Sequence, residues 1–309
     1  MLNLPSQVKT QISLAPYTTF KIGGPAKYFM VITTQADLLK VMAWVKRNQL
    51  SFYVMGAGGN VLVSDQGYDG LVIVMQNDQL EWTGSTVIAG AGVKNGQLIA
   101  GALHHRLGGL QWLIGVPGTI GGSIYGNAGG HGWGLGDAVV WVETLSPDGD
   151  IHRFSKSECQ FSYRHSRFKR SAGQIITQAC LKLFRVDPAR EKELLAQTIA
   201  AKQSNQPITL ATAGCMFTNP TVNPDRLPAD LAKYVDSNGQ LAAWRLINYV
   251  DLSGYRMGQV QISTVHANFM INLGRATADQ VVQLISLVKQ RIRDKLGIQL
   301  TEEIQYLGF

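Results

Sequence analysis

The feature that most constrains the fold is the distribution of glycine along the chain. Of the 33 glycines, 25 lie before residue 151 and only 8 lie after it. Seven of the sixteen residues from Gly115 to Gly130 are glycine, with serine and asparagine among the rest. Glycine loses more conformational entropy on folding than any other residue, so such a run is costly as structural filler. We therefore expect this loop to wrap closely around a ligand, for which a pyrophosphate is the natural candidate.

Another glycine loop, Val54–Val63, contains Gly56, Gly58 and Gly59. Because it comes earlier in the chain, we call it the first glycine loop, and Gly115–Gly130 the second. Successive backbone N–H groups in such a loop can point at a phosphate. A Rossmann fingerprint would place a third glycine at position 61 and then a helix. Position 61 is valine, and residues 61–63 are typical of a strand. The pattern therefore predicts strand–loop–strand and disfavours a doubly wound fold.

Hydrophobic periodicity predicts mixed helices and strands. The glycine-poor second half, with alternating helices and short strands, predicts a separate domain that begins after residue 187. A Pro-Asp-Gly turn at 147–149 predicts a hairpin, and Thr277 with Gln280 predicts a capping box. We expect helices at 36–48, 94–106, 188–204 and 277–296, and strands at 52–55, 61–63, 71–75, 86–89, 139–145, 151–154, 174–184 and 303–307.

Composition narrows the class of protein. A chain of 309 residues, 45% hydrophobic and 16% charged, is typical of a soluble globular protein with more than one domain. Because there is no apolar run of 18 residues and no signal peptide, we expect a cytoplasmic protein without a membrane partner. Three widely spaced cysteines predict reduced thiols, and no residue spacing predicts a metal site.

The formal charge of +7 indicates an anionic partner. Residues 152–170 combine basic and aromatic side chains, a mixture that can bind single strands. The other basic residues are scattered, so we favour a small phosphorylated ligand over nucleic acid, and we expect a monomer.

The order of motifs resembles a known family. Gly56-Ala-Gly-Gly-Asn60 and the later Gly115-x-Pro-Gly-x-x-Gly-Gly-x-x-x-x-Asn-Ala-Gly129 look like the FAD-binding domain of the vanillyl-alcohol-oxidase (PCMH) type. With five further segments they resemble the UDP-N-acetylenolpyruvoylglucosamine reductase family over nearly the whole chain. These segments are Thr18–Ala26, Ser162–Phe168, Ala213–Pro220, Ser263–Asn272 and Glu303–Gly308.

The resemblance implies an α+β fold, in which an FAD-binding domain of two α/β lobes is followed by a C-terminal α+β substrate-binding domain. The expected boundaries are 1–187, with lobes at about 15–75 and 76–187, and 188–309, whose last ten or so residues pack back on the flavin site. It also implies the residues that bind FAD: Gly56, Gly58, Gly59, Asn60, Gly118, Thr119, Gly121, Gly122, Ser123, Asn127 and Ala128. Some relatives tether FAD to a histidine in the first glycine loop; this loop has none, so we expect non-covalent FAD.

The implied reaction is NADPH-dependent reduction of UDP-N-acetyl-3-O-(1-carboxyvinyl)-glucosamine to UDP-N-acetylmuramate in peptidoglycan precursor synthesis. Arg164 matches the arginine that stabilises an enolate, and Glu303, chosen over Glu302 because it directly precedes Ile304, matches the glutamate beside it. Cys215 stands where the family usually has the serine that donates a proton. A thiol, with a pKa of about 8.5, is a stronger acid than an alcohol and still mostly protonated at neutral pH.

Four further residues, Tyr163, Asn219, Arg256 and His266, are expected to bind substrate. Thr218 departs from the family, in which lysine is common, and Arg256 or Lys21 is a candidate to compensate. Two alternatives stay open: another sugar or alcohol oxidoreductase of the same flavin fold, and a non-catalytic paralogue that only binds a nucleotide sugar. The changes at Cys215 and Thr218 favour the paralogue, whereas Arg164 and Glu303 count against it.

Overall fold

The computed structural model describes residues 5–130, 132–171 and 173–309, and these form two compact units. Unit 1 comprises residues 5–12, Ala26–Ala57 and Asp69–Lys202, and unit 2 comprises Ser13–Pro25, Gly58–Tyr68 and Gln203–Phe309. Two short segments from the first quarter of the chain therefore pack with the C-terminal part. The contiguous division at residues 187 and 188 stays a prediction.

One sheet of unit 1 has the strand order β1-β2-β5-β3. Its strands are β1 (Lys9–Ser13), β2 (Pro25–Ile32), β5 (Tyr68–Met75) and β3 (Phe52–Met55). Helix α1 (Gln35–Arg47) connects β2 to β3, which pairs in parallel with β5. The helix predicted here from apolar spacing is confirmed, and its buried residues are Leu38, Val41, Met42, Trp44 and Val45. Leu39, which the spacing grouped with them, is exposed. The first glycine loop begins at the carboxyl end of β3.

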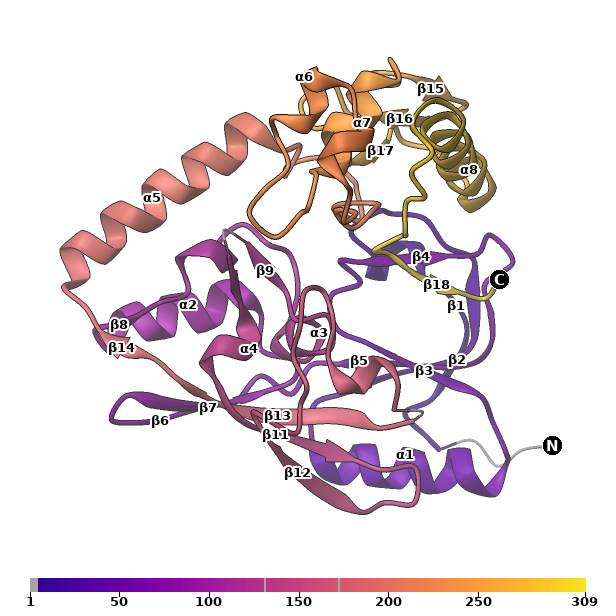
Figure 1. The fold of residues 1–309 in the computed structure, drawn as a ribbon. Helices are drawn as coiled ribbons and strands as arrows, with labels where there is room; N and C mark the ends of the chain where they lie inside the picture. Colours follow the sequence, from indigo (N-terminus) through magenta and orange to yellow (C-terminus); the bar gives the residue numbers. More distant parts are fainter. Residues whose placement is uncertain (1–4, 131, 172) are drawn as a thin grey trace. The chain divides into compact units, whose positions relative to one another are not determined.

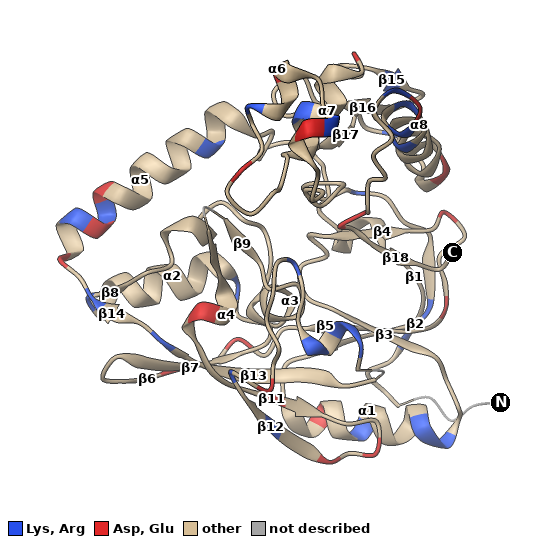
Figure 2. Ribbon diagram, in the orientation of Figure 1, with Lys and Arg blue, Asp and Glu red and all other residues tan. Residues whose placement is uncertain are grey.

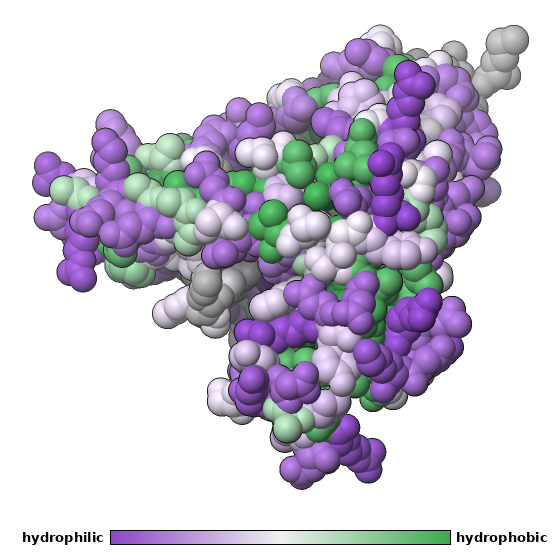
Figure 3. Space-filling view, turned by 90° about the horizontal axis from the view of Figure 1, so that it is seen from above, coloured by the Kyte–Doolittle hydropathy of each residue, from purple (hydrophilic) through white to green (hydrophobic). Residues whose placement is uncertain are grey.

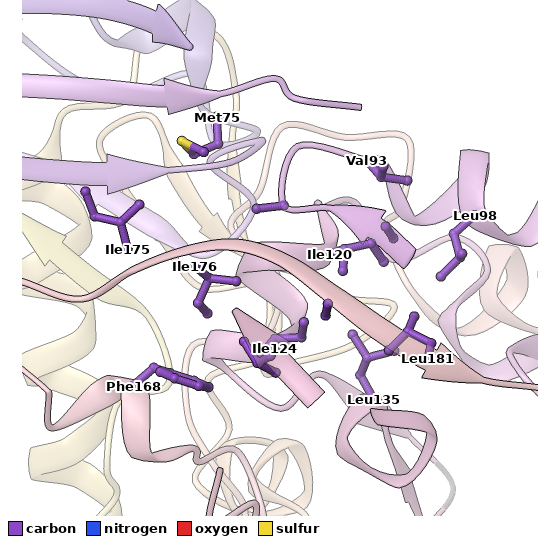
Figure 4. Packing of buried hydrophobic residues seen from close by; sticks show 14 of the residues in the cluster. Met75, Val93, Leu98, Ile120, Ile124, Leu135, Phe168, Ile175, Ile176 and Leu181 are labelled. Carbon is purple, nitrogen blue, oxygen red and sulfur yellow. The ribbon is translucent and has the colours of Figure 1, made fainter. Parts of the chain in front are cut away.

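The second sheet of unit 1 is antiparallel, with the order β12-β11-β13-β7-β6 (Figure 1). Its strands are β12 (Ile151–Ser155), β11 (Val139–Leu145), β13 (Ile175–Lys182), β7 (Thr86–Gly90) and β6 (Leu80–Thr83). The predicted hairpin is confirmed, since Leu145 pairs with Ile151 across the turn. Ile176 and Leu181 of β13 lie near Ile124 and Leu135, which come from α3 (Ile120–Tyr125) and α4 (Leu135–Ala138), in the buried cluster of Figure 4.

Shorter elements complete unit 1. Helix α2 (Asn95–His104) confirms the predicted helix there, and α5 (Pro188–Asn205) belongs to unit 1 as far as Lys202. The two-stranded pairs are β8 (Leu107–Gly108) with β14 (Phe184–Arg185), and β9 (Gly129–Gly130) with β10 (Trp133–Gly134). The 3-10 turns of this unit are Gln111–Leu113 and Arg167–Lys169.

Unit 2 packs its helices and short strands around a separate core that includes Phe20, Leu62 and Phe217. Strand β4 (Val61–Val63) pairs in parallel with β18 (Gln305–Leu307), and β15 (Arg256–Met257), β16 (Val260–Ile262) and β17 (Met270–Asn272) form a second sheet. The helices are α6 (Ala229–Ala232), α7 (Ala243–Tyr249) and α8 (Ala278–Leu296), with 3-10 turns at Ala15–Tyr17 and Pro224–Arg226.

Helix α8 begins as its sequence predicted. The Thr277 side chain accepts a hydrogen bond from the Gln280 N–H, and the Gln280 side chain reaches back to the backbone of Thr277. The Asp65 carboxylate accepts from the N–H groups of Ala278 and Asp279 at 3.0 and 3.2 Å. A negative group at this end of a helix is stabilising, so Asp65 ties the segment after β4 to α8 within unit 2.

Among the described residues, no helix is long and apolar enough to cross a membrane. Helices α1, α5 and α8 each carry both basic and acidic residues (Figure 2). Hydrophilic and hydrophobic residues are likewise intermixed on the face in Figure 3.

Candidate active site

The two glycine loops meet within unit 1. A Cβ atom at Gly56 would lie 2.1 Å from the Oγ1 atom of Thr119, so only glycine fits there. Thr119 is the N-cap of α3, and its Oγ1 accepts from the N–H of Gly122 at 3.5 Å. This close approach of two loops that are distant in sequence is the geometry expected of a bipartite nucleotide cradle.

Unit 1 fixes the shape of the second loop with side chains outside the motif. The amide of Asn95 donates to the Val116 carbonyl at 3.2 Å, and its oxygen accepts from the buried Ser123 hydroxyl at 3.0 Å. At the start of the loop, the Lys202 ammonium donates to the carbonyls of Trp112 and Ile114, both at 2.6 Å. Burial lowers the pKa of Lys202 to about 8.

The remainder of the first loop belongs to unit 2. Gly58 has a φ of 62°, and a Cβ there would lie 2.3 Å from the Tyr17 carbonyl oxygen. The side-chain amide of Asn60 donates to the Glu303 carbonyl at 3.0 Å, while the Asn60 carbonyl accepts from the N–H of Gln305 at 2.9 Å. Asn60, which is predicted to bind FAD, therefore also holds the backbone of Glu303, the predicted catalytic glutamate.

Arg164 occupies a tight turn of unit 1. Ser162 and His165 exchange two backbone hydrogen bonds of 3.0 Å across the turn, and Arg164 has a left-handed φ of 53°. Its Nη1 donates to the Gly129 carbonyl at 2.9 Å, and its own carbonyl accepts from the Lys169 ammonium at 2.8 Å. The arginine is thus held at both its backbone and its guanidinium.

Tyr163 is the other central residue of that turn. Its side chain is largely exposed, and its ring centroid lies 5.5 Å from the guanidinium carbon of Arg164. The two residues predicted to contact substrate from unit 1 are therefore neighbours in space as well as in sequence.

Unit 2 brings Cys215 and Glu303 together. The N–H of Glu303 donates to the Met216 carbonyl at 2.8 Å, directly beside Cys215. Cys215 forms an isolated antiparallel bridge with Phe269 and is half-buried. Two positions after Cys215, Phe217 is held by the buried side chain of Asn268. The Asn268 side chain accepts from the Phe217 N–H at 3.0 Å and donates to the Phe217 carbonyl at 2.8 Å.

The two adjacent glutamates have different surroundings. Glu302 forms an ion pair of 2.7 Å with Lys289 on α8. The Glu302 carboxylate is therefore part of a structural ion pair within unit 2. The contacts of Arg164 lie within unit 1, and the hydrogen bond between Glu303 and Met216 lies within unit 2.

The remaining predicted substrate residues lie in unit 2. The His266 ring packs on Phe269, with centroids 4.9 Å apart, and so lies near Cys215. Burial lowers the pKa of His266, and its buried Nδ1 has no hydrogen-bond partner among the described residues. Burial therefore favours the neutral form of the ring, and its Nδ1 is a candidate to exchange a hydrogen bond with a ligand.

Asn219 and Arg256 each have protein partners. The Asn219 oxygen accepts from the N–H of Ala243, the first residue of α7, at 3.0 Å. Arg256 donates to the Gly258 carbonyl and to the side chain of Gln259 within its own hairpin. The Thr218 hydroxyl donates to the Thr301 carbonyl at 3.3 Å.

Sequence reasoning missed Lys169, Asn268 and Lys202, which hold the predicted site residues or their loops. Asn268 lies in the quoted motif Ser263–Asn272, and its position among apolar neighbours was an available signal. A buried asparagine needs partners for its amide, which predicts a backbone clamp. Lys169 and Lys202 offered no local signal, because their partners are carbonyl groups brought close only by the fold.

Gly56→Ala should impair flavin binding. The added methyl group would overlap Thr119, and overpacking of this kind costs about 1–3 kcal/mol. We expect flavin affinity to fall about tenfold to hundredfold, as measured by titrating FAD into flavin-depleted protein. Gly96→Ala is the control, because nothing lies within 4 Å of a Cβ there. Equal affinity in both variants would contradict the cradle.

Comparison with known proteins agrees with this geometry. A family model described as an FAD binding domain matches residues 26–155, which include both glycine loops. Together with the meeting of those loops, this defines the chain as a flavoprotein. A second family model, described as the C-terminal domain of UDP-N-acetylenolpyruvoylglucosamine reductase, matches residues 206–307.

Whole-length relatives identify the family. The UDP-N-acetylenolpyruvoylglucosamine reductase of Synechococcus sp. (strain JA-3-3Ab) is 34% identical over 99% of this chain and 93% of its own length. That of Chloroherpeton thalassium is 35% identical over 98% and 94%. The crystal structure of the Thermus caldophilus enzyme has a TM-score of 0.79 and 30% identity, covering 97% of this chain and 98% of that one. The chain belongs to the UDP-N-acetylenolpyruvoylglucosamine reductase family and is an FAD-dependent oxidoreductase, as the motifs predicted.

Proposed function

We propose that this enzyme reduces UDP-N-acetyl-3-O-(1-carboxyvinyl)-glucosamine to UDP-N-acetylmuramate, with NADPH as the electron donor, in peptidoglycan precursor synthesis. The observation that carries the proposal is the hydrogen bond from the Glu303 N–H to the carbonyl of Met216, the residue that follows Cys215. It places the backbone of the proposed carboxylate beside the segment that carries the proposed acid, and a positioned acid of this kind suits protonation of a substrate carbon.

Residues of the two glycine loops would hold FAD, which supplies hydride transfer between NADPH and the substrate. The close approach of Gly56 to Thr119 supports this assignment, because it brings the two glycine-rich loops, with their backbone N–H groups, to one place. The first loop contains no histidine, so we propose non-covalent binding and expect acid precipitation to release the flavin.

Arg164 would stabilise the negative charge that develops on the substrate carboxylate as it becomes enolate-like. A cation held in place before the reaction lowers the barrier without reorganisation, and the turn at Ser162–His165 supplies that rigidity. Glu303 would take part in the same step.

Cys215 would protonate the carbon next to the carboxylate. A protonated thiol can donate as a hydroxyl does, so replacing the usual serine by cysteine retains the chemistry. The half-buried position of Cys215 supports this role, whereas Cys159 and Cys180 are buried packing residues.

Tyr163, Asn219, Arg256 and His266 would contact the nucleotide sugar. His266 has the clearest support, since its buried Nδ1 has no partner among the described residues. The net charge of +7 favours attraction of an anionic substrate.

We place the enzyme in the cytoplasm as a monomer without nucleic-acid or membrane partners. Supply of a cell-wall precursor there would link it to cell shape and division. The scattered charges of α1, α5 and α8 support the absence of a nucleic-acid surface (Figure 2).

The proposal is tested by incubating the enzyme with NADPH and the enolpyruvyl UDP-sugar and determining the product by mass spectrometry. We expect one NADPH oxidised for each product formed, with the product heavier than the substrate by two hydrogen atoms. A binding paralogue would bind the sugar without turnover, and an oxidase of the same fold would reduce its flavin with a sugar or alcohol instead.

A further inference from the structure

Asn127 uses its polar groups on protein partners. Its side-chain Nδ2 donates to the Ser162 carbonyl at 2.8 Å, and its Oδ1 accepts from the N–H of Gly136 at 2.9 Å. Its backbone N–H donates to the Ile124 carbonyl at 3.1 Å. The backbone N–H, one N–H of the side-chain amide and the side-chain oxygen of Asn127 are thus all bonded to protein groups.

These bonds link the second glycine loop to the turn that carries Arg164. Ser162 is the first residue of that turn, and Gly136 lies in the first turn of α4. The same two segments are joined by Arg164 Nη1 with the Gly129 carbonyl, and by the Ser166 hydroxyl with the Tyr125 carbonyl at 2.7 Å. Asn127 therefore bridges the arginine turn and α4 from the middle of the loop.

The residue type fits this task closely. Asn127 has a φ of 43°, a left-handed conformation that asparagine tolerates better than most residues. A carboxamide also has an NH₂ group that donates and an oxygen that accepts, as the Ser162 carbonyl and the Gly136 N–H require. Aspartate would keep the shape and the backbone conformation but would present an oxygen to the Ser162 carbonyl.

We propose that Asn127 is a positioning residue for Arg164 and not a ligand of the flavin. It fixes the Ser162 end of the turn, so that the guanidinium is already in place when charge develops on the substrate. This inference rests on the proposed function of Arg164. A displacement of about 1 Å at a positioned group can cost about a hundredfold in rate.

Asn127→Asp tests the inference through separate half-reactions. We expect unchanged flavin content and NADPH-driven flavin reduction within about twofold of the native rate. Reoxidation by the enolpyruvyl substrate should fall about tenfold to hundredfold. In an Arg164→Ala background the same substitution should cause little further loss, because a positioning residue acts through the group it positions.

Asn77→Asp is a matched control. Asn77 likewise donates to a carbonyl, that of Thr177, at 2.7 Å and accepts from an N–H, that of Gly92, at 3.0 Å. The Asn77→Asp variant therefore shows the effect of losing a similar pair of side-chain amide hydrogen bonds elsewhere in unit 1. We expect a comparable loss of thermal stability but reoxidation within about twofold of the native rate.

Hydrogen–deuterium exchange supplies a readout that is independent of activity. The His165 N–H is bonded to the Ser162 carbonyl, so loosening the turn should speed exchange in peptides that cover residues 160–170. Asn127→Asp should show this change, and Asn77→Asp should not.

Three results would overturn the inference: native reoxidation in Asn127→Asp, a loss that adds fully to that of Arg164→Ala, or a loss of flavin with unaltered exchange at 160–170. Failure of the native enzyme to be reoxidised by the substrate would instead refute the proposed function. The exchange comparison would still decide whether Asn127 holds the turn.

Discussion

Replacing Cys215 with alanine is expected to lower turnover about 10²–10⁴-fold, the usual worth of a positioned general acid. The substrate should still bind, because the thiol acts on the reacting carbon and the remaining polar contacts persist. Stopped-flow measurement of flavin reoxidation, with substrate affinity determined by titration of the oxidised enzyme, separates these two effects.

Cys215→Ser is the informative companion, since a hydroxyl can donate the same proton and activity should be retained. Native activity should fall as pH rises through the pKa of the thiol, because a thiolate has no proton to give. The activity of the serine variant should not show this fall at high pH. A nearly fully active alanine variant with the native pH profile would make Cys215 a packing residue and strengthen the paralogue alternative.

Alkylation offers a check on the same residue. Burial raises the pKa of Cys159 to about 11 and also raises that of Cys180, so neither is readily present as the reactive thiolate. Inactivation of the native enzyme by iodoacetamide should therefore track modification of Cys215. Bound substrate should protect it, and Cys215→Ser should be resistant.

Arg164→Ala is expected to separate the two half-reactions. Reduction of the flavin by NADPH should remain within about twofold, because no enolate forms in that step. Reoxidation by the enolpyruvyl substrate should fall about 10²–10³-fold, the scale of losing one fixed electrostatic group at a developing charge. Rapid-mixing absorbance at the flavin band measures both rates.

Neighbouring residues provide the controls for this experiment. Arg170 is exposed and lies in the same basic stretch, so Arg170→Ala should leave both rates near native. Glu303→Gln should behave like Arg164→Ala, whereas Glu302→Gln should lose only the ion pair with Lys289. Equal reoxidation in Arg164→Ala and Arg170→Ala would remove Arg164 from the mechanism.

Local features of the fold were predictable from sequence because their causes are local. The capping box at Thr277 and Gln280 began α8 where expected, and the Pro-Asp-Gly turn placed the hairpin of β11 and β12. Valine at position 61 correctly indicated a strand after the first glycine loop. These signals depend on residues within a few positions of one another.

Long-range pairings were not predictable in the same way. Nothing in residues 58–68 shows that they pack with residues 203–309, because that association depends on β4 pairing with β18 and on Asp65 meeting the start of α8. For the site, motif positions supplied Arg164, Cys215 and Glu303, whose roles stay predictions. The apolar neighbours of Asn268 indicate that its amide needs backbone partners, but only the fold identifies that partner as Phe217.

The central claim is that this flavoenzyme passes electrons from NADPH to the enolpyruvyl group of a UDP-sugar. The most direct measurement is anaerobic reduction of the bound flavin by one equivalent of NADPH, followed by addition of the enolpyruvyl UDP-sugar. The account predicts that the flavin absorbance bleaches and then returns in full on mixing, with one UDP-N-acetylmuramate formed for each flavin. A flavin that NADPH reduces but that stays bleached after the sugar is added would contradict it.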